Sequence, residues 1–456
     1  MTLRVAGCQS GLLLFSILFC TSCTAQVGDT ESNVSEANPS RVVVIPQTTA
    51  TAAPTTDWSR FRGPAGDGSS SAVGLPADWD SSTAGQGNLI WKTPLAGAGA
   101  SSPIVWQDHI YLTSYTGYFV PGEPMGSLDD LKRHVLCFDR TSGELLWDRE
   151  FAAKLPEEER IRDHGYAANT PVADADGLYV FLGKSGVVAL THSGEDRWQA
   201  DVGSGTNGWG TAASPVLYDD LVLVNASVES ESLVALDQKS GEERWRVGGM
   251  KESWNTPQLV RSPGGDDELV MAIFGKVLGL APATGKQLWS CNTDITWYMV
   301  PSIVAGDGVA YSLGGRSGVA GLAVKTGGQG DVTASRRLWT SNKGSNVPSP
   351  VYQDGHLYWT HDKLGIAYCA KAESGELAYE ERLNRCGDVY ASALLADGKV
   401  YYINREGRVF VVAAKPEFEL LATNEMRDGG QFNASPAVDG QRLLIRSDKF
   451  LYCIGK

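Results

Sequence analysis

Short runs of alternating apolar and polar residues recur along most of the chain and are separated by turn residues. Segments such as GHLYWTHD (355–362) and GKVYYINRE (398–406) place apolar side chains at every second position. This period of two indicates β-strands rather than helices. From about Trp58 onward, the pattern therefore predicts many short strands joined by tight turns, and the high glycine and tryptophan content agrees with it.

These predicted strands are organised in a repeat. Each unit opens with Ser or Thr before Pro, continues through three strands, and ends with Ser/Thr-Gly-Glu, an apolar residue and Trp. The prolines lie 42 to 49 residues apart, except for one step of 68 that carries an insertion. They are Pro103, Pro171, Pro215, Pro257, Pro301, Pro350 and Pro436, with Ala393 in the remaining copy. A period in the forties built of short strands is typical of β-propeller blades.

The last unit of the repeat is incomplete. Eight units begin in the same way, but the eighth ends at Lys456 before any tryptophan strand. A ring with one unpaired blade would expose a strand edge. The segment 88–95, which contains LIWKTPL, has only the ending that the eighth unit lacks. We therefore predict an all-β, eight-bladed, monomeric propeller of four-stranded antiparallel blades, whose last blade is closed by the N-terminal strand 88–95.

A tryptophan occupies the same place at the end of several units. The set consists of Trp91, Trp147, Trp198, Trp245, Trp289 and Trp339. A single blade cannot bury its own faces, so a large ring at a fixed position suits packing against the neighbouring blade. We predict a structural role between blades for all of them.

The segment that leads into these tryptophans resembles a known repeat. ALDQKSGEERW (235–245) carries the pattern A-x-D-x-x-[ST]-G-x-x-x-W, which is similar to that of the pyrroloquinoline-quinone-like (PQQ-like) β-propeller family. The branches of this family include quinoprotein dehydrogenases and BamB, the lipoprotein of the outer-membrane β-barrel assembly machinery. The resemblance covers about Trp58 to Lys456, and DWSRFRGPAGDG (57–68) looks like the opening of exported members. It implies the propeller fold and leaves the function open, because this fold hosts unrelated activities.

The N-terminus has the features of an export signal over residues 1–23. Arg4 precedes an apolar run from Leu12 to Phe19, and small residues follow. The sequence CTSC (20–23) resembles the lipobox of bacterial lipoproteins, although Cys20 stands where leucine is usual. We therefore predict lipidation of Cys23; the alternative is an ordinary signal peptide cleaved nearby. Residues 24–56 have the composition of a disordered linker, and the propeller is expected at 57–456. We therefore expect an exported protein, either periplasmic or anchored to the outer membrane of a bacterium, or otherwise secreted.

The net charge and the positions of the cysteines and histidines restrict the possible partners and metal sites. The sequence has 39 basic and 53 acidic residues and a net charge of −14, which argues against nucleic acid as a partner. Cys137, Cys369 and Cys453 lie in similar apolar strands, so they are interpreted as small core residues rather than disulfide partners. The six histidines have no zinc-binding spacing, and no metal site is assigned.

Two sets of loop residues are expected on one face of the propeller. The loops before each first strand carry aromatic residues, and the turns between second and third strands carry basic ones. The aromatic set is Tyr166, Trp209, Trp254, Trp297, Tyr298, Tyr390 and Phe432, and the basic set is Lys184, Lys276, Arg316, Lys363, Arg405 and Lys449. The rings would stack a planar ligand or anchor a partner at the mouth of the central channel, or else pack between blades. The basic residues would favour an anionic ligand or acidic partner, or else are simply solvated.

Two functions are compatible with these features. The favoured hypothesis is a non-catalytic binding or scaffold protein of the cell envelope, whose partner is an envelope protein or a small anionic or planar ligand. The insertions at 118–134 and 152–168 would supply partner contacts, and no catalytic residue is assigned. The alternative is a periplasmic PQQ-dependent alcohol or sugar dehydrogenase, with PQQ and Ca²⁺ as cofactors. The vicinal cysteine pair of many such enzymes and a haem CxxCH motif do not occur in this sequence.

Overall fold

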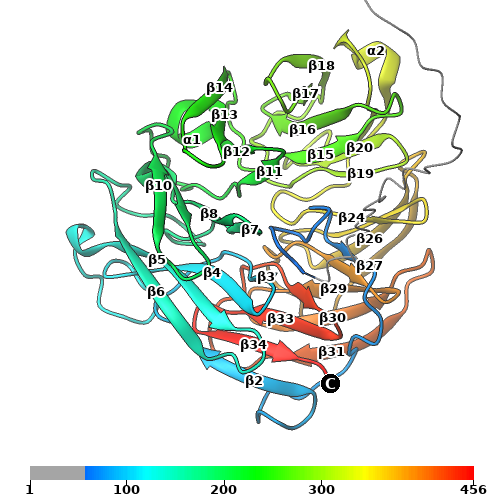
Figure 1. Cartoon of the computed structure of the whole chain (residues 1–456). Coiled ribbons are helices and arrows are strands. Elements are labelled where there is room, and N and C mark those ends of the chain that lie inside the picture. The colour runs from blue at the N-terminus through cyan, green and yellow to red at the C-terminus, as the bar shows by residue number, and fades with distance from the viewer. Residues whose placement is uncertain (1–56) are drawn as a thin grey trace, which may run out of the picture. The chain divides into compact units, whose positions relative to one another are not determined.

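The computed structural model describes residues 57–456, and the predicted signal segment, Cys23 and the linker lie outside that range. The described residues form eight antiparallel four-stranded blades arranged in a ring (Figure 1), two of them with an extra short strand. The predicted all-β, eight-bladed propeller is confirmed. Within 57–456 the helices are α1 (Ser227–Ser230), α2 (Thr333–Arg336) and the 3-10 turns η1 (Leu128–Asp130) and η2 (Gly183–Ser185). No helix in this range is long and apolar enough to cross a membrane.

Each blade starts with a short strand near the axis and runs outward (Figure 1). Blades one to four consist of β3 (Ile104–Trp106), β4 (His109–Thr116), β5 (Lys132–Asp139) and β6 (Leu145–Ala152); β7 (Val172–Asp174), β8 (Gly177–Phe181), β9 (Val187–Leu190) and β10 (Asp196–Ala200); β11 (Val216–Tyr218), β12 (Leu221–Ala226), β13 (Ser232–Asp237) and β14 (Glu243–Gly248); and β15 (Gln258–Arg261), β16 (Asp267–Ile273), β17 (Lys276–Leu280) and β18 (Gln287–Asn292).

The remaining blades follow the same order. They consist of β19 (Val304–Gly306), β20 (Val309–Leu313), β21 (Gly321–Lys325) and β23 (Arg337–Ser341); β24 (Val351–Gln353), β25 (His356–Thr360), β26 (Ile366–Lys371) and β27 (Leu377–Arg382); β28 (Leu394–Ala396), β29 (Lys399–Ile403), β30 (Arg408–Ala413) and β31 (Leu420–Glu425); and β32 (Ala437–Asp439), β33 (Arg442–Arg446), β34 (Phe450–Ile454) and β2 (Leu89–Pro94). Two short strands extend blades in parallel: β1 (Ser69–Ser70) pairs with β28, and β22 (Gly330–Asp331) pairs with β18.

Burial follows the position of a strand in its blade. In blade two, every residue of β8 (GLYVF) and β9 (VVAL) is buried, because both faces of a middle strand are covered by neighbouring blades. The outer strand β6 (LLWDREFA) instead alternates between half-buried and exposed residues. The five cysteines within 57–456 are buried and form no disulfide in that range.

The motif Ser/Thr-Gly before the outer strand has a packing reason. Gly143 has φ of 72°, and a Cβ there would lie 2.5 Å from Trp91 Cδ2, so the indole of one blade covers a glycine turn of the next. The same contact is made by four further pairs: Trp147 with Gly194, Trp198 with Gly241, Trp245 with Gly285, and Trp339 with Gly375.

Trp289 is arranged differently. It is fully buried beside Gly279 of its own blade, and its Nε1 donates to Glu268 Oε2 over 2.9 Å.

The ring is closed by pairing of its two sequence ends. Strand β2 pairs antiparallel with β34, with Trp91 opposite Cys453 and Pro94 opposite Phe450. Leu89 and Trp91 are both buried in the core that this blade shares with its neighbours. The predicted closure by strand 88–95 is therefore confirmed, with observed bounds of Leu89–Pro94.

Residues 57–70 fill one end of the central channel. The carbonyl of Trp58 accepts from Val105 N in blade one (2.9 Å), and that of Ser59 accepts from Ala173 N in blade two (2.9 Å). Farther along, Gly68 O accepts from Leu395 N in blade seven (2.8 Å). This plug segment, defined as residues 57–70, thus connects blades one, two and seven and leaves the opposite end as the mouth.

A closed ring of hydroxyl groups surrounds the channel just before the first strands. In each blade, the backbone amide of one Ser or Thr donates to the side-chain oxygen of the equivalent residue in the next blade, over 2.9 to 3.1 Å. The members, here called the hydroxyl ring, are Ser102, Thr170, Ser214, Thr256, Ser302, Ser349, Ser392 and Ser435. The sequence assignment of Pro301 as a repeat proline is wrong by two positions, because Ser302 takes the ring position and Ile303 the proline position that follows it.

Candidate functional site

A cavity of about 240 Å³ lies at the mouth of the channel. Six members of the hydroxyl ring line it, namely Ser102, Thr256, Ser302, Ser349, Ser392 and Ser435. Phe61 of the plug segment also reaches it. The remaining wall is built by loops before first strands and by turns between second and third strands, which are the two kinds of loop that the sequence placed on one face.

Four of the predicted aromatic residues line this cavity: Trp209, Trp254, Tyr298 and Tyr390. Tyr298 is central to them, with its ring centroid 5.4 Å from that of Trp254 and 5.7 Å from that of Trp209. The Trp297 ring centroid lies 5.0 Å from that of Tyr298. Because these rings come from the loops before three successive blades, they form one continuous aromatic wall.

The other two predicted aromatic residues are buried away from the mouth. Tyr166 packs edge-on against Tyr115, and its hydroxyl donates to Glu158 O over 2.8 Å. Phe432 is fully buried and covers Gly407, where a Cβ would lie 2.5 Å from its ring. Both side chains therefore pack in the structure instead of facing a ligand.

The predicted basic residues are also divided between those at the cavity and those away from it. Arg316 and Lys363 line the cavity, and Arg405 binds Asp163, which also lines it. Lys184 is buried and donates to the carbonyl of Pro156. The two remaining residues lie outside the cavity lining: Lys276 begins β17 with an exposed side chain, and Lys449 donates to Gly429 O over 3.0 Å.

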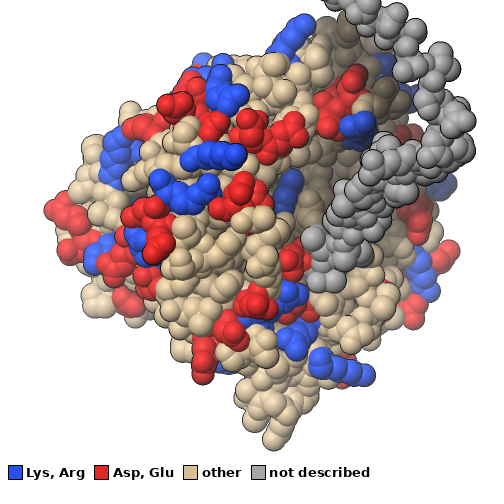
Figure 2. Space-filling model, in the orientation of Figure 1, with Lys and Arg blue, Asp and Glu red and all other residues tan. Residues whose placement is uncertain are grey.

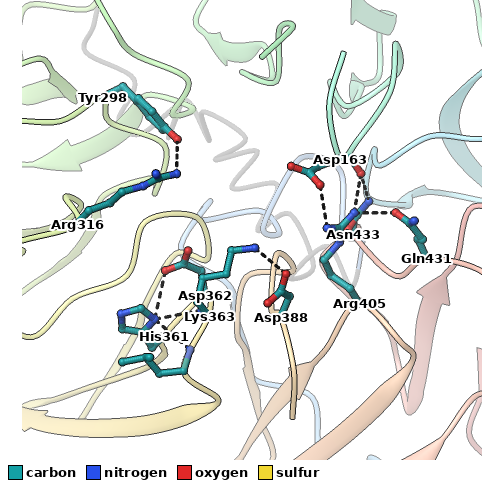
Figure 3. Close-up of polar contacts among 11 residues, drawn as sticks. Asp163, Tyr298, Arg316, His361, Asp362, Lys363, Asp388, Arg405, Gln431 and Asn433 are labelled. Atoms are coloured by element: carbon teal, nitrogen blue, oxygen red, sulfur yellow. Dashed lines mark hydrogen bonds and ion pairs between the residues drawn. The ribbon is translucent and has the colours of Figure 1, made fainter. Parts of the chain in front are cut away.

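The cations at the mouth already have partners (Figure 3). Lys363 Nζ lies 2.6 Å from Asp388 Oδ2, and Arg405 Nη1 lies 3.0 Å from Asp163 Oδ1. Arg316 donates to the Tyr298 hydroxyl over 3.3 Å and lies over the Trp297 ring at 4.6 Å. The mouth thus presents balanced ion pairs beside aromatic rings, and the visible surface likewise mixes acidic with basic side chains (Figure 2).

Titratable groups at the mouth have shifted pKa values. Burial opposes ionisation of Asp163, but the Arg405 guanidinium, helped by Tyr390 and Lys363, lowers the pKa of this carboxyl overall. Burial lowers the pKa of His164, whose Nε2 lies 2.7 Å from Trp209 O. Burial also lowers the pKa of His361, whose Nδ1 accepts from Lys363 N over 3.1 Å. Burial thus favours the neutral form of both imidazoles.

Two parts of the site were not assigned from the sequence. Asp163 and His164 belong to the insertion at 152–168, and no motif marks them. The hydroxyl ring did have a signal, because Ser or Thr recurs at the start of the units, but its role as cavity wall depends on contacts between blades. In the described range 57–456, no group of three or more His, Cys, Asp or Glu residues is placed to hold a metal ion.

The architecture and the channel site define an eight-bladed PQQ-like β-propeller. The model of the family described as outer membrane protein assembly factor BamB matches residues 131–380, which is more than half of the chain. The chain therefore belongs to this family. A comparison with curated proteins finds no match.

Solved structures show the same fold at low sequence identity. BamB from Moraxella catarrhalis is 14% identical, with a TM-score of 0.56 over 80% of this chain and 98% of that one. A europium-containing methanol dehydrogenase is 12% identical, with a TM-score of 0.61 over 88% and 98%. A quinohemoprotein alcohol dehydrogenase from Comamonas testosteroni is 13% identical, with a TM-score of 0.58 over 89% and 81%. An assembly factor and dehydrogenases thus share this ring, and the fold alone does not decide between their functions.

Proposed function

We propose that the chain is a non-catalytic binding protein of the cell envelope, which holds an envelope protein at the mouth of its channel. The observation that carries this proposal is the convergence of Trp209, Trp254 and Tyr298 from separate blades on one cavity, beside Arg316. Aromatic and arginine side chains in a concave, rigid surface are the usual anchors of protein interfaces. The family match supports the proposal, because the matching family is that of an outer membrane protein assembly factor.

The proposed binding role is tested by capturing the partner from envelope extracts after cross-linking. The double variant Trp209→Ser, Tyr298→Ser should reduce the yield of the captured partner at least about tenfold, since interface anchors often contribute 2 kcal/mol or more each. The matched control is Leu145→Ser, Leu146→Ser, which changes two exposed leucines on the outer strand β6. Equal capture by the mouth variant and the wild type would contradict the proposal.

Export and lipidation of Cys23, followed by the tether 24–56, complete the proposed role. With its own signal segment, the wild-type protein should fractionate with membranes and carry a lipid mass on residue 23. The Cys23→Ser variant should be released into the soluble envelope fraction. A soluble wild-type protein with an unmodified Cys23 would remove the anchor from the proposal and leave the binding role to be judged by the capture experiment.

A second candidate is a PQQ-dependent alcohol or sugar dehydrogenase. The observation in its favour is that the cavity sets aromatic rings beside Arg316 and Lys363, which suits a planar molecule with carboxylates. When bound, the quinone would supply the electron acceptor. Adding PQQ and Ca²⁺ to the purified protein should then give a stoichiometric absorbance change and dye reduction by an alcohol. Absence of both would leave the binding role as the better explanation.

A further inference from the structure

The insertion between β6 and β7 is anchored firmly at one end. This strap, defined as residues 153–168, places Glu157 against Arg133, with 2.6 Å between Oε2 and Nη2 and side chains only 6% and 3% exposed. The Tyr118 hydroxyl donates to Glu159 O over 2.7 Å. The strap is therefore held over blades one and two by buried contacts that solvent screens little.

The middle of the strap reaches blades seven and eight. Asp163 O accepts from Asn433 Nδ2 over 2.8 Å and from Arg405 Nη2 over 3.0 Å, while its carboxylate accepts from Arg405 Nη1 (Figure 3). The side chain of Asp163 is 35% exposed, in contrast to the buried anchor. Because exposed ion pairs contribute little stability, this contact of Asp163, here called the tip, is the weaker of the two attachments.

Arg405 is built to receive an anionic group. Its guanidinium lies over the Tyr390 ring at 4.4 Å, and its Nε donates to Asn433 Oδ1 over 2.9 Å. Gln431 Oε1 accepts from Nη2 over 2.7 Å. Stacking and these hydrogen bonds fix the plane of the guanidinium, so two N–H groups point at the position where the Asp163 carboxylate and carbonyl now lie.

We propose that the strap is a latch on the cavity, and that the cavity's occupant carries an anionic group which displaces Asp163 from Arg405. In the free protein Asp163 is the intramolecular competitor for that group. The identity of the occupant rests on the proposed function, but the opening of the strap does not. The displacing anionic group belongs either to a small anion or to an acidic side chain of a protein partner, since both offer the same oxygen acceptors.

The latch can be tested without knowing the occupant, because Arg160 and Arg162 of the strap are exposed trypsin sites. Arg405→Gln leaves the strap sequence intact and removes the charge that holds its tip. Cleavage within the strap should become at least about tenfold faster than in the wild type. The matched control, Arg149→Gln, removes an exposed ion pair with Asp196 on outer strands and should leave the rate unchanged. An unchanged rate in a folded Arg405→Gln variant would overturn the proposal.

Asn433→Ala provides a milder second variant in case Arg405→Gln does not fold. It removes the donor to Asp163 O, so cleavage in the strap should accelerate by a smaller factor. Equal cleavage of this variant and the wild type would also count against the latch, because the tip would then be held by something else.

Two anionic probes test displacement and separate the sources. At constant ionic strength, 8-anilinonaphthalene-1-sulfonate represents a small aromatic anion, and triglutamate represents an acidic protein segment. At least one probe should accelerate strap cleavage in the wild type, and the rate should saturate with probe concentration. Neither probe should accelerate cleavage in Arg405→Gln. A response to the first alone indicates a small molecule, and a response to the second alone indicates an acidic segment. No response to either in the wild type would refute displacement, whatever the partner capture shows.

Discussion

The backbone amide of Ser435 donates a hydrogen bond to the hydroxyl of Ser102 over 3.0 Å and so joins the last blade to the first. The two residues are 333 positions apart in the chain. Together with the pairing of β2 and β34, this contact gives the propeller a second closure, near the axis. The sheet closes the ring at its rim and the hydroxyl ring closes it at its centre.

Loss of one hydroxyl from this inner ring should destabilise the protein. Ser435→Ala leaves the buried amide of Ser392 without its acceptor, now 2.9 Å away, and an unsatisfied buried donor costs about 1 to 3 kcal/mol. Ser435→Thr keeps the oxygen, and Thr170 and Thr256 already occupy equivalent positions, so its effect should be smaller. Urea unfolding measures both free energies. Equal stability of the alanine and threonine variants would show that the hydroxyl is dispensable.

The packing of tryptophan on glycine predicts a sharp difference between two glycine positions. Gly143 and Gly355 have φ of 72° and 74°, but only a Cβ at Gly143 would collide with an indole, that of Trp91. Gly355→Ala should cost only the backbone strain of about 1 to 2 kcal/mol. Gly143→Ala should cost about 1 to 3 kcal/mol more, because Trp91 must move. Thermal unfolding of the pair is the measurement, and similar melting temperatures would refute the contact.

Removal of the closing strand should open the ring. Deleting residues 88–95 leaves β34 without its partner β2, and the exposed edge can pair with another chain. We expect an unfolded or oligomeric protein in size-exclusion chromatography. A synthetic peptide of residues 86–97, added during refolding, should restore part of the monomer. A stable monomer without the peptide would contradict closure by this strand.

A buried carboxyl group gives the stability of the protein a defined pH dependence. Burial raises the pKa of Glu229 from 4.5 to about 8, and its Oε2 is without a hydrogen-bond partner within residues 57–456. The folded state therefore holds a proton that the unfolded chain releases. The resulting stability is fully present below pH 4.5 and is lost as the pH rises through 8.

Glu229→Gln removes this titration and keeps the shape of the side chain. Between about pH 5 and pH 9, the free energy of unfolding of the wild type should decrease as the pH rises. The decrease in Glu229→Gln over the same range should be smaller by at least about 2 kcal/mol. Glu231→Gln, at an exposed neighbouring position, is the control and should follow the wild type. Parallel pH profiles for wild type and Glu229→Gln would show that this carboxyl group titrates normally.

Much of the fold could be predicted from the sequence, because the repeat encodes it directly. The Ser/Thr-Gly motif and the tryptophan endings fix the blades, and the incomplete eighth unit identifies the closing strand. The register was predicted wrongly in one unit, because Pro301 aligns with the other prolines although Ser302 holds the ring position. In that copy the amide-to-hydroxyl contact with Thr256, 3.0 Å long, decides the alignment, and sequence alone does not contain it.

The site was predictable only in outline. The two kinds of loop were placed on the correct face, and Tyr298 and Arg316 do meet there. Whether a particular ring reaches the cavity depends on small neighbours, as Phe432 shows by filling the space beside Gly407. The arrival of Asp163 beside Arg405 depends on the path of a whole insertion, which no local pattern determines.

The plug segment has a consequence for anything that the cavity receives. Phe61 of the plug segment forms part of the cavity wall, so this segment lies between the cavity and the far end of the channel. A molecule bound there would then enter and leave through the mouth, where Asp163 and His164 of the strap line the cavity. A protein docked over the mouth would block the exit. The residence time of a molecule in the cavity would then be set by dissociation of the docked protein rather than by the contacts inside the cavity.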